Sequence, residues 1–500
     1  MLRACVLVPA LAATGWAQQP VLRLISPSFA IVTDGAADDA RQLLTELEVF
    51  RQTVSRFFNL PHEHRMTVNV YLWSDATKFE QFRPPSVPRE RPLGGYHRSD
   101  GFMHALVVRL SDDPRVTRSS LFHEYTHLLT NRPFRSVPLW MTEGVADLLS
   151  TFRIEGSKFS FGHPEQADIR TLTAAGILPA AKLIEVEHDS EAYRAPAAVP
   201  QFYASAWLLS HVLTVSSHGF NAAPVRDYIL QSSMTTNRIE AFRRAFGITP
   251  DEADRRARRQ LEANAFPQVA APFDGAAVAA PIQQRLAPPE IALQEGMLAR
   301  LLGLDARAEE LLREARSSLP GDSRPVEQLG FLRDQQGRSE EALQLIEAAL
   351  ALGSVSCQTH QIAARLRWNK LVAASPGGQA ATSERREVLR LSERAVRLDP
   401  WQADCQALYA FVLLQVEPRN PRAAEAVARR ALQLDPDLHA ARLTLARALL
   451  AGGQTVAARR TIQTLMDSPL SAGLRQRVDE LATRLGLDHP VQTRAPAVGR

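Results

Sequence analysis

The sequence predicts two kinds of structure in one chain, an α+β domain followed by an all-α repeat solenoid. In the first half, short β-branched runs alternate with helical stretches, whereas the second half is almost continuously helical and rich in Ala, Leu, Arg and Glu. A length of 500 residues also exceeds what one hydrophobic core can hold. We therefore expect several domains, with the change of texture near residues 271–288.

The composition is that of a globular protein, with 45% hydrophobic and 22% charged residues. The formal net charge of +4 is small for this length and there is no dense basic run, so no nucleic-acid partner is expected. No run reaches the about 18 apolar residues of a membrane-spanning helix, so no transmembrane anchor is expected. Cys357 and Cys405 either pair or simply pack, and the fold is not a disulfide scaffold.

The first residues resemble a secretory signal peptide. Arg3 precedes a short apolar run, and small residues stand where a signal peptidase would cut, near Ala17. A buried N-terminal helix is the alternative, but Pro9 interrupts the run. We expect residues 1–17 to be removed and the mature protein to be secreted or periplasmic.

Residues 18–270 carry the mixed pattern of strands and helices. Three apolar runs are expected to form strands and one amphipathic stretch a long helix, at 29–33, 67–73 and 105–110 for the strands and 37–58 for the helix. The Ala- and Pro-rich segment 271–288 lacks either hydrophobic period, and we interpret it as a linker.

Small residues recur in the second half as in a helix-pair unit of about 34 residues. Four positions in one unit have the same offsets as four in a later unit: Gly330, Gly337, Ala342 and Ala349, against Ala446, Gly453, Ala458 and Leu465. These residues resemble tetratricopeptide repeats, and we expect four or five of them over 289–485, then a tail at 486–500. A nonrepeating helical bundle is the alternative. Such solenoids usually hold a peptide or protein on the concave face, so a protein partner is expected there.

The stretch LFHEYTHLL contains two histidines four positions apart, His123 and His127, with Glu124 between them. Pro114 and Pro133 bound a predicted helix around this stretch. Side chains four apart on a helix project in nearly the same direction, so both imidazoles can bind one ion. Glu124 lies about 100° round the helix, beside the open position of that ion, where its carboxylate can act as a base.

A catalytic zinc ion needs a third protein ligand and an open position for water. Glu143 is the candidate, because the loop to Pro138 lets a second helix, Leu139–Ser150, run back beside the first. Asp147 lies one turn beyond Glu143, where its carboxylate can accept the free ring N–H of a ligand histidine; an ordinary exposed acid is the alternative. Trp140 is interpreted as a packing residue. The sequence therefore predicts a site for one Zn²⁺ ion.

The stretch HEYTH, followed by PLWMTEGVAD, resembles the gluzincin metallopeptidases, in particular peptidase MA-like domains with a Trp-x-x-Glu-Gly motif. The similarity extends over roughly residues 26–265 and implies a zincin-like fold. It implies that the zinc ligands are His123, His127 and Glu143. It also implies that Glu124 is the general base and that Asp147 is the carboxylate that supports a ligand histidine. In the resembled family a tyrosine stabilises the oxyanion, and Tyr203 is at the matching position. The alternatives are that Tyr203 is a core tyrosine and that His211 is the donor. No Gly-x-Met-Glu-Asn motif is present, which weakens an exopeptidase function.

These patterns predict a secreted or periplasmic zinc peptidase acting on a protein or peptide substrate. Zinc lowers the pKa of bound water from about 15.7 towards about 7, Glu124 takes the proton, and a donor such as Tyr203 stabilises the oxyanion. The resemblance also implies that an extended substrate adds to the strand at 105–110. The alternative function is an envelope scaffold that acts through its repeats and has an inactive peptidase-like domain.

Overall fold

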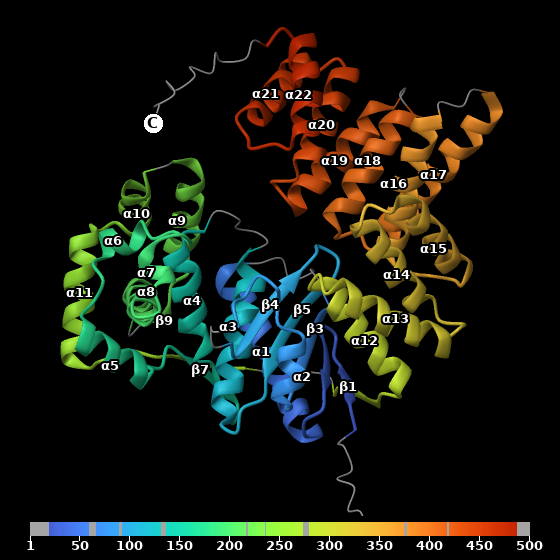
Figure 1. Cartoon of the computed structure of the whole chain (residues 1–500). Helices are drawn as coiled ribbons and strands as arrows, with labels where there is room; N and C mark the ends of the chain where they lie inside the picture. Colours follow the sequence, from blue (N-terminus) through green and yellow to red (C-terminus); the bar gives the residue numbers. More distant parts are fainter. Residues whose placement is uncertain are drawn as a thin grey trace, which may run out of the picture.

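The computed structural model describes residues 20–59, 67–89, 93–131, 137–216, 219–235, 237–273, 280–374, 378–417 and 420–487. A mixed sheet, a group of helices and a helical solenoid make up this part of the chain (Figure 1). The predicted signal peptide lies outside the described residues, as does the tail from residue 488 onward. Among the described helices, none has both the length and the apolar character that crossing a membrane requires.

The main sheet has six strands in the order β11-β1-β2-β3-β5-β4. Their bounds are β1 (Leu22–Ile25), β2 (Phe29–Thr33), β3 (Val68–Trp73), β4 (Gly95–Ser99), β5 (His104–Arg109) and β11 (Ile282–Arg285). β2, β3 and β5 are parallel, and the other strands join in antiparallel pairs. The three strands predicted from apolar runs are confirmed to within one residue at each end.

The helices before the solenoid follow the sheet strands or gather beside them. They are α1 (Ala37–Phe58), α2 (Ala76–Gln81), α3 (Pro114–Asn131), α4 (Leu139–Ser150), α5 (Gln166–Ala175), α6 (Ala180–Ile184), α7 (Glu191–Arg194), α8 (Val199–Thr214), α9 (Ala223–Met234), α10 (Arg238–Phe246) and α11 (Pro250–Ala263). Two smaller sheets lie among these helices. One consists of β10 (Val269–Pro272), β7 (Lys158–Phe161) and β6 (Arg153–Glu155), and the other of β8 (Val215–Ser216) and β9 (Gly219–Phe220). In Figure 1, α8 lies inside the group formed by α4 to α11.

Both faces of the main sheet are buried. Along β5, Leu106 belongs to the core that α1 and α3 cover, whereas Val107 belongs to a second core on the other side with Phe79 of α2. Successive strand residues point to opposite faces, so a strand that is buried on both faces appears in the sequence as a continuous apolar run. The run ALVV in β5 has this origin.

The second half of the chain forms antiparallel helix pairs that stack into a curved solenoid (Figure 1). The pairs are α12 (Pro288–Leu301) with α13 (Asp305–Ser318), α14 (Ser323–Gln335) with α15 (Ser339–Ala351), α16 (Cys357–Ala374) with α17 (Gly378–Leu398), α18 (Ala403–Val416) with α19 (Pro421–Leu434), and α20 (His439–Ala451) with α21 (Thr455–Met466), followed by α22 (Ala472–Arg484). A Cβ at Gly330 would lie 2.8 Å from Ile346 Cδ1, so this small residue marks a close approach of α14 and α15, as predicted. Cys357 and Cys405 are free thiols.

The segment 271–288, predicted as a linker, is more than a connector. Residues Ile282–Arg285 form β11, which pairs with β1, and the segment begins within β10, which pairs with β7. Strand pairing uses main-chain hydrogen bonds, so the exposed run IQQR pairs without any hydrophobic alternation that the sequence could display.

The first repeat is part of the core of the N-terminal region. Leu293 and Leu298 of α12 share a core with Tyr71 and Trp73 of β3, and the Tyr71 hydroxyl donates a hydrogen bond to the Gln294 carbonyl at 3.1 Å. The apolar face of α12 therefore covers the side of the sheet opposite to α1 and α3. A deletion of residues 289–485 would expose this side of the sheet.

The prediction that substrate adds to the strand at 105–110 is wrong in its placement. That strand, β5, pairs with β3 on one side and with β4 on the other. Its main-chain hydrogen-bonding groups are used on both sides, so a further strand has no place there. β4 is the strand at this edge of the sheet, and its sequence GYHRS is too polar to have been recognised as a strand.

Candidate metal centre

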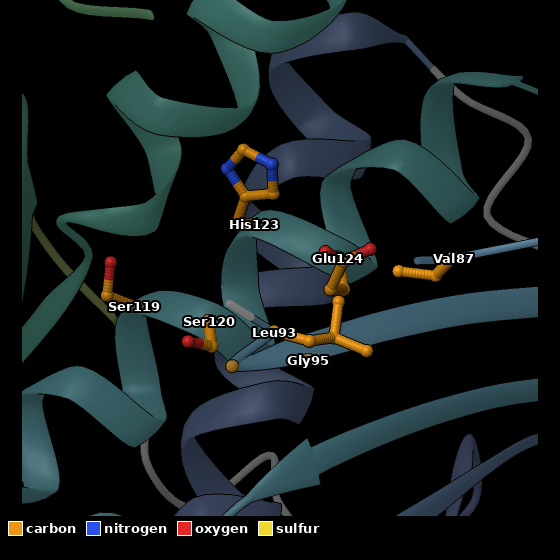
Figure 2. A pocket seen from close by; sticks show the side chains of 8 residues that line it. Val87, Leu93, Gly95, Ser119, Ser120, His123 and Glu124 are labelled. Atoms are coloured by element: carbon orange, nitrogen blue, oxygen red, sulfur yellow. The ribbon is translucent and has the colours of Figure 1, made fainter. Parts of the chain in front are cut away.

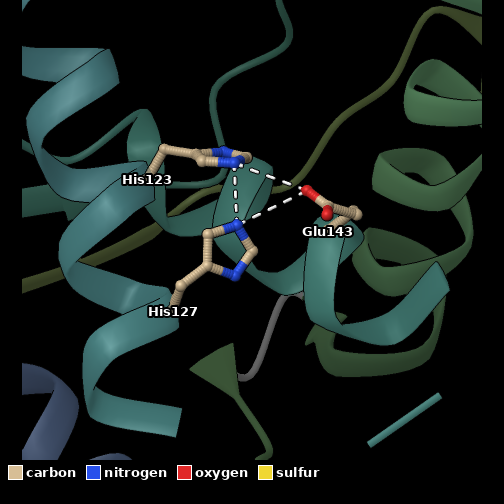
Figure 3. Close-up of side chains that lie close together, drawn as sticks. All are labelled: His123, His127 and Glu143. Atoms are coloured by element: carbon tan, nitrogen blue, oxygen red, sulfur yellow. Dashed lines mark hydrogen bonds and ion pairs between the residues drawn. The ribbon is translucent and has the colours of Figure 1, made fainter. Parts of the chain in front are cut away.

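Helices α3 and α4 pack side by side and bring His123, His127 and Glu143 together (Figure 3). The two Nε2 atoms of His123 and His127 are 3.0 Å apart. Glu143 Oε2 lies 3.5 Å from His123 Nε2 and 3.4 Å from His127 Nε2. α4 has the bounds that the sequence predicts, and α3 begins at Pro114 and ends before Pro133, as expected. The packing of the two helices places the Glu143 carboxylate opposite the two imidazoles.

The spacing of these three atoms fits a tetrahedral zinc site. Ligand atoms at zinc bond lengths of about 2.0–2.1 Å lie about 3.4 Å apart along the edges of a tetrahedron. The observed separations of 3.0, 3.4 and 3.5 Å surround this value. Glu143 Oε2 is also buried without a hydrogen bond of normal geometry, facing the two imidazole nitrogens. Two imidazoles and one carboxylate suit zinc and leave one corner of the tetrahedron for water.

Asp147 holds His123 from the side away from the other two residues. Its Oδ1 lies 2.8 Å from His123 Nδ1, so Nδ1–H donates to the carboxylate and Nε2 faces His127 and Glu143. Burial lowers the pKa of His123, but the charge and hydrogen bond of Asp147 outweigh burial and hold this pKa well above its usual value. Its role as a support for a metal ligand stays a prediction.

Burial and the neighbouring histidines also shift the pKa of Glu143 in opposite directions. Burial raises the pKa of its carboxyl group, but the polar contacts and charges of the two facing imidazoles, His123 and His127, lower this pKa below its usual range. The ionised carboxylate, which is the form that binds a metal, is therefore favoured next to the two imidazoles.

Glu124 projects from α3 towards β4, where its carboxylate meets His97. It lines an open cleft of about 300 Å³, whose wall is formed by Val87, Leu93, Gly94, Gly95, Ser119, Ser120, His123 and Glu124 (Figure 2). Burial raises the pKa of Glu124, but a hydrogen bond to His97 and the charges of His123 and His127 bring it below the usual value. The cleft therefore brings the half-buried Glu124 carboxylate and His123, one of the three clustered residues, to one open wall.

Two residues at the site were not predicted from the sequence. His97 Nδ1 lies 2.9 Å from Glu124 Oε2, and the Tyr193 hydroxyl lies 3.4 Å from Glu143 Oε1. His97 could have been found from its place in GGYHRSDG, because alternation with the buried Tyr96 directs it to the face that α3 covers. Tyr193 lies on the four-residue helix α7, and only the tertiary fold brings it to α4.

Tyr203 lies beside Tyr193, with the ring centroids 6.2 Å apart. Burial, followed by the negative charge of Glu143, raises the pKa of Tyr203. Its role at an oxyanion stays a prediction, and Tyr193 is the neighbouring tyrosine whose hydroxyl reaches Glu143. The alternative donor, His211, is fully buried and bonded to the Gly162 carbonyl and the Gln260 amide, and burial lowers its pKa to about 4.

Trp140 is a packing residue, as predicted from the sequence. Its side chain is fully buried, with its ring 5.8 Å from that of Tyr228 and 6.3 Å from that of Phe242. These contacts join α4 to α9 and α10, and so help to hold the helix that carries Glu143.

Gly144 determines how closely α4 approaches α8, and its replacement by alanine should be strongly destabilising. A Cβ at this position would lie 2.2 Å from the Ala206 carbonyl oxygen and 2.3 Å from Ser210 Oγ. Because backbone atoms cannot give way, we expect Gly144→Ala to lower the free energy of unfolding by about 3 kcal/mol. A displacement of α4 away from α8 should also move the adjacent Glu143 relative to His123 and His127. Urea unfolding followed by circular dichroism measures the first effect.

Gly473→Ala is the matched control for this substitution, because a Cβ at Gly473 in α22 meets no atom within 4 Å. It should leave the unfolding midpoint unchanged or raise it slightly, since alanine favours a helix by about 1 kcal/mol over glycine. Equal midpoints for Gly144→Ala and Gly473→Ala would contradict the close packing of α4 on α8.

Comparison with known protein families gives a match in the solenoid. The family model described as a tetratricopeptide repeat matches residues 416–469, which include α20 and α21. The second half of the chain carries tetratricopeptide repeats. The match contains the later set of small residues that predicted them, and it counts against a nonrepeating bundle. It lies outside the segment that carries the candidate metal centre.

Several solved structures are also similar to part of this chain. They are the MamA protein (14% identity, TM-score 0.28, covering 39% of this chain and 94% of that one), YrrB, a TPR protein with an unusual peptide-binding site (14%, 0.30, 38% and 90%), and TTC0263, a thermophilic TPR protein of Thermus thermophilus (19%, 0.30, 39% and 99%). No curated protein matches the sequence.

Proposed function

We propose that this chain is a secreted or periplasmic zinc-dependent peptidase with a zincin-like domain, and that its tetratricopeptide repeats bind a protein substrate or partner. The observation that carries the proposal is the convergence of three ligand-type atoms at the edge lengths of a zinc tetrahedron. The carboxylate of Glu124 beside this cluster, and that of Asp147 behind His123, add the two groups that such a site needs.

In this proposal each side chain has a separate task. His123, His127 and Glu143 hold the ion, and Asp147 keeps the His123 ring in the tautomer that leaves Nε2 free. Zinc in this position supplies Lewis acidity, which makes a water molecule nucleophilic at neutral pH and polarises a carbonyl group. Glu124 accepts the proton of that water and later transfers it to the leaving amine.

The substrate is proposed to be an extended polypeptide in the cleft beside β4. Val87 and Leu93 offer apolar contacts there, while Ser119 and Ser120 of α3 offer polar ones. β4 is the edge strand, so its outer main-chain groups can pair with an added strand. A tyrosine hydroxyl, that of Tyr203 as predicted or of its neighbour Tyr193, is the proposed donor to the oxyanion.

Metal content and hydrolysis of the purified full-length chain test the proposal directly. We expect about one zinc per chain by elemental analysis, and cleavage of casein or of a peptide library that stops with a zinc chelator and returns with added zinc. A zinc-free protein whose hydrolysis, if any, ignores the chelator would overturn the proposal. Magnesium added after chelation is the control, because a site with two imidazoles should not recover with this ion.

A second candidate function is that of an envelope scaffold with an inactive peptidase-like domain. The match of the tetratricopeptide repeat family favours it, because such repeats form extended surfaces that bind proteins. Partners captured by the wild-type chain and by Glu124→Gln discriminate between the two functions. If the chain is a scaffold, the wild-type protein and Glu124→Gln should capture the same intact partners. If the chain is a peptidase, Glu124→Gln should capture intact partners that the wild-type protein cleaves.

A further inference from the structure

The turn between β4 and β5 lies against the solenoid. The fully buried Arg300 of α12 donates from Nη2 to Asp100 Oδ2 at 3.0 Å and from Nε to Gln328 Oε1 of α14 at 2.7 Å. Gln402, next to the start of α18, donates from Nε2 to the Gly101 carbonyl at 2.8 Å. Three helix pairs of the solenoid are thus connected to one turn of the sheet.

Within this turn, the Asp100 side chain binds both the turn's own backbone and the solenoid. Its Oδ1 accepts hydrogen bonds from the backbone N–H groups of Phe102 and Met103, at 3.0 and 2.7 Å, while Oδ2 binds Arg300. A buried guanidinium paired with a carboxylate that also holds the backbone makes a contact of fixed geometry. The turn therefore adopts its position jointly with the repeats.

The same hairpin reaches the proposed base. His97 lies three residues before Asp100 on β4, about 10 Å away at the rise of a strand. Its Nδ1 is 2.9 Å from Glu124 Oε2, and its ring lies 5.5 Å from that of His127 at an interplanar angle of 32°. Gly95 on the same face leaves room for this contact, since a Cβ there would lie 3.0 Å from Val108 Cγ2 and 3.7 Å from Glu124 Cγ.

We propose that His97 is a positioning residue for Glu124, and that the repeats determine its position by holding the β4–β5 turn through Arg300 and Gln402. The inference rests on the proposed role of Glu124 as a base. An imidazole fixed at hydrogen-bonding distance restricts the rotation of this carboxylate in the open cleft. A protein bound to the solenoid that moves α18 relative to α12 would thereby change the proposed metal centre without touching it.

The first arm of the test concerns His97 itself. His97→Ala should lower kcat about tenfold with little change in KM or in zinc content, because a single hydrogen bond to a charged group is removed. His97→Asn should recover most of kcat, since its amide nitrogen occupies the place of Nδ1. Arg98→Ala, at an exposed position next to His97, is the control and should behave as wild type. An unchanged kcat in His97→Ala would overturn the positioning role.

The second arm concerns the repeats and needs no activity. Gln402→Ala should speed hydrogen exchange of the amides at residues 100–103 and shift the His97 ring nitrogen signal in a histidine-labelled full-length chain. Gln406→Ala is the matched control, because this amide lies one turn further along, within α18, and donates to the Pro400 carbonyl and not to the turn of the sheet. If Gln402→Ala leaves both signals at their wild-type values, the coupling through the turn is overturned.

The two arms separate the inference from the proposed function. A chain that binds zinc but cleaves no peptide would remove the peptidase function and with it the positioning role of His97. The exchange rates and the ring signal would still decide whether the repeats hold the hairpin that carries His97.

Discussion

Glu124→Gln should leave zinc bound and reduce hydrolysis by about 10²–10⁴-fold in kcat. The substitution keeps the size of the side chain but removes the proton acceptor. Zinc content should not change, because the Glu124 carboxylate is hydrogen-bonded to His97 and is not one of the three clustered ligand atoms. Elemental analysis together with initial rates on a peptide substrate measures the two quantities on the same preparation.

Glu185→Gln provides the control for this charge change, since Glu185 is an exposed glutamate at the end of α6. It should match wild type in both zinc content and rate. Turnover by Glu124→Gln at the rate of the Glu185→Gln control would exclude Glu124 as the base.

Glu143→Ala should remove zinc while leaving the fold in place. This change deletes one of three proposed ligands and leaves two imidazoles on a single helix, which is too few for a stable catalytic site. Changing a residue that only supports a ligand costs about 10–100-fold in metal affinity, so loss of a ligand should cost about 100-fold or more. Titration against a competing chelator measures the affinity, and circular dichroism reports whether the helices remain.

Asp147→Asn is the graded comparison, because it keeps a side chain of the same shape beside His123 Nδ1 but weakens the hydrogen bond. Its loss of affinity should lie within the 10–100-fold range of a supporting residue and below that of Glu143→Ala. Thermal unfolding gives a second measurement, since zinc that binds the folded chain raises the unfolding temperature of the wild type. The same rise in Glu143→Ala would show that Glu143 is not a ligand.

Local sequence was sufficient to predict the parts of the site that lie on helices. His123 and His127 are four residues apart, which is about one turn of α3. Pro138 directly precedes α4, which begins at Leu139 as the sequence predicts. Glu143 and Asp147 follow from the same four-residue spacing on the second helix. The placement of each of these side chains depends on the geometry of a single helix, which a short window of sequence expresses, whereas their roles at a metal stay predictions.

Predictions failed where strand pairing was decisive. The polar runs in β4 and β11 pair with β5 and β1 through main-chain groups, so neither contains the apolar run by which the other strands were predicted. The edge of the sheet was therefore assigned to the wrong strand, and part of a sheet was interpreted as a linker. For the same reason, the use of α12 as a cover for the sheet was not predicted.

The sequence by itself determined the order of an α+β region and a tetratricopeptide solenoid, the helix that carries two histidines, and the helix that carries Glu143. Only the tertiary structure decided that these helices lie at ligand distance, that His97 reaches Glu124, and that Arg300 and Gln402 hold the turn beyond His97. Helical periodicity is a local property that any short window of sequence expresses. Contacts between distant segments depend on main-chain pairing and on the packing of whole layers, which no such window contains.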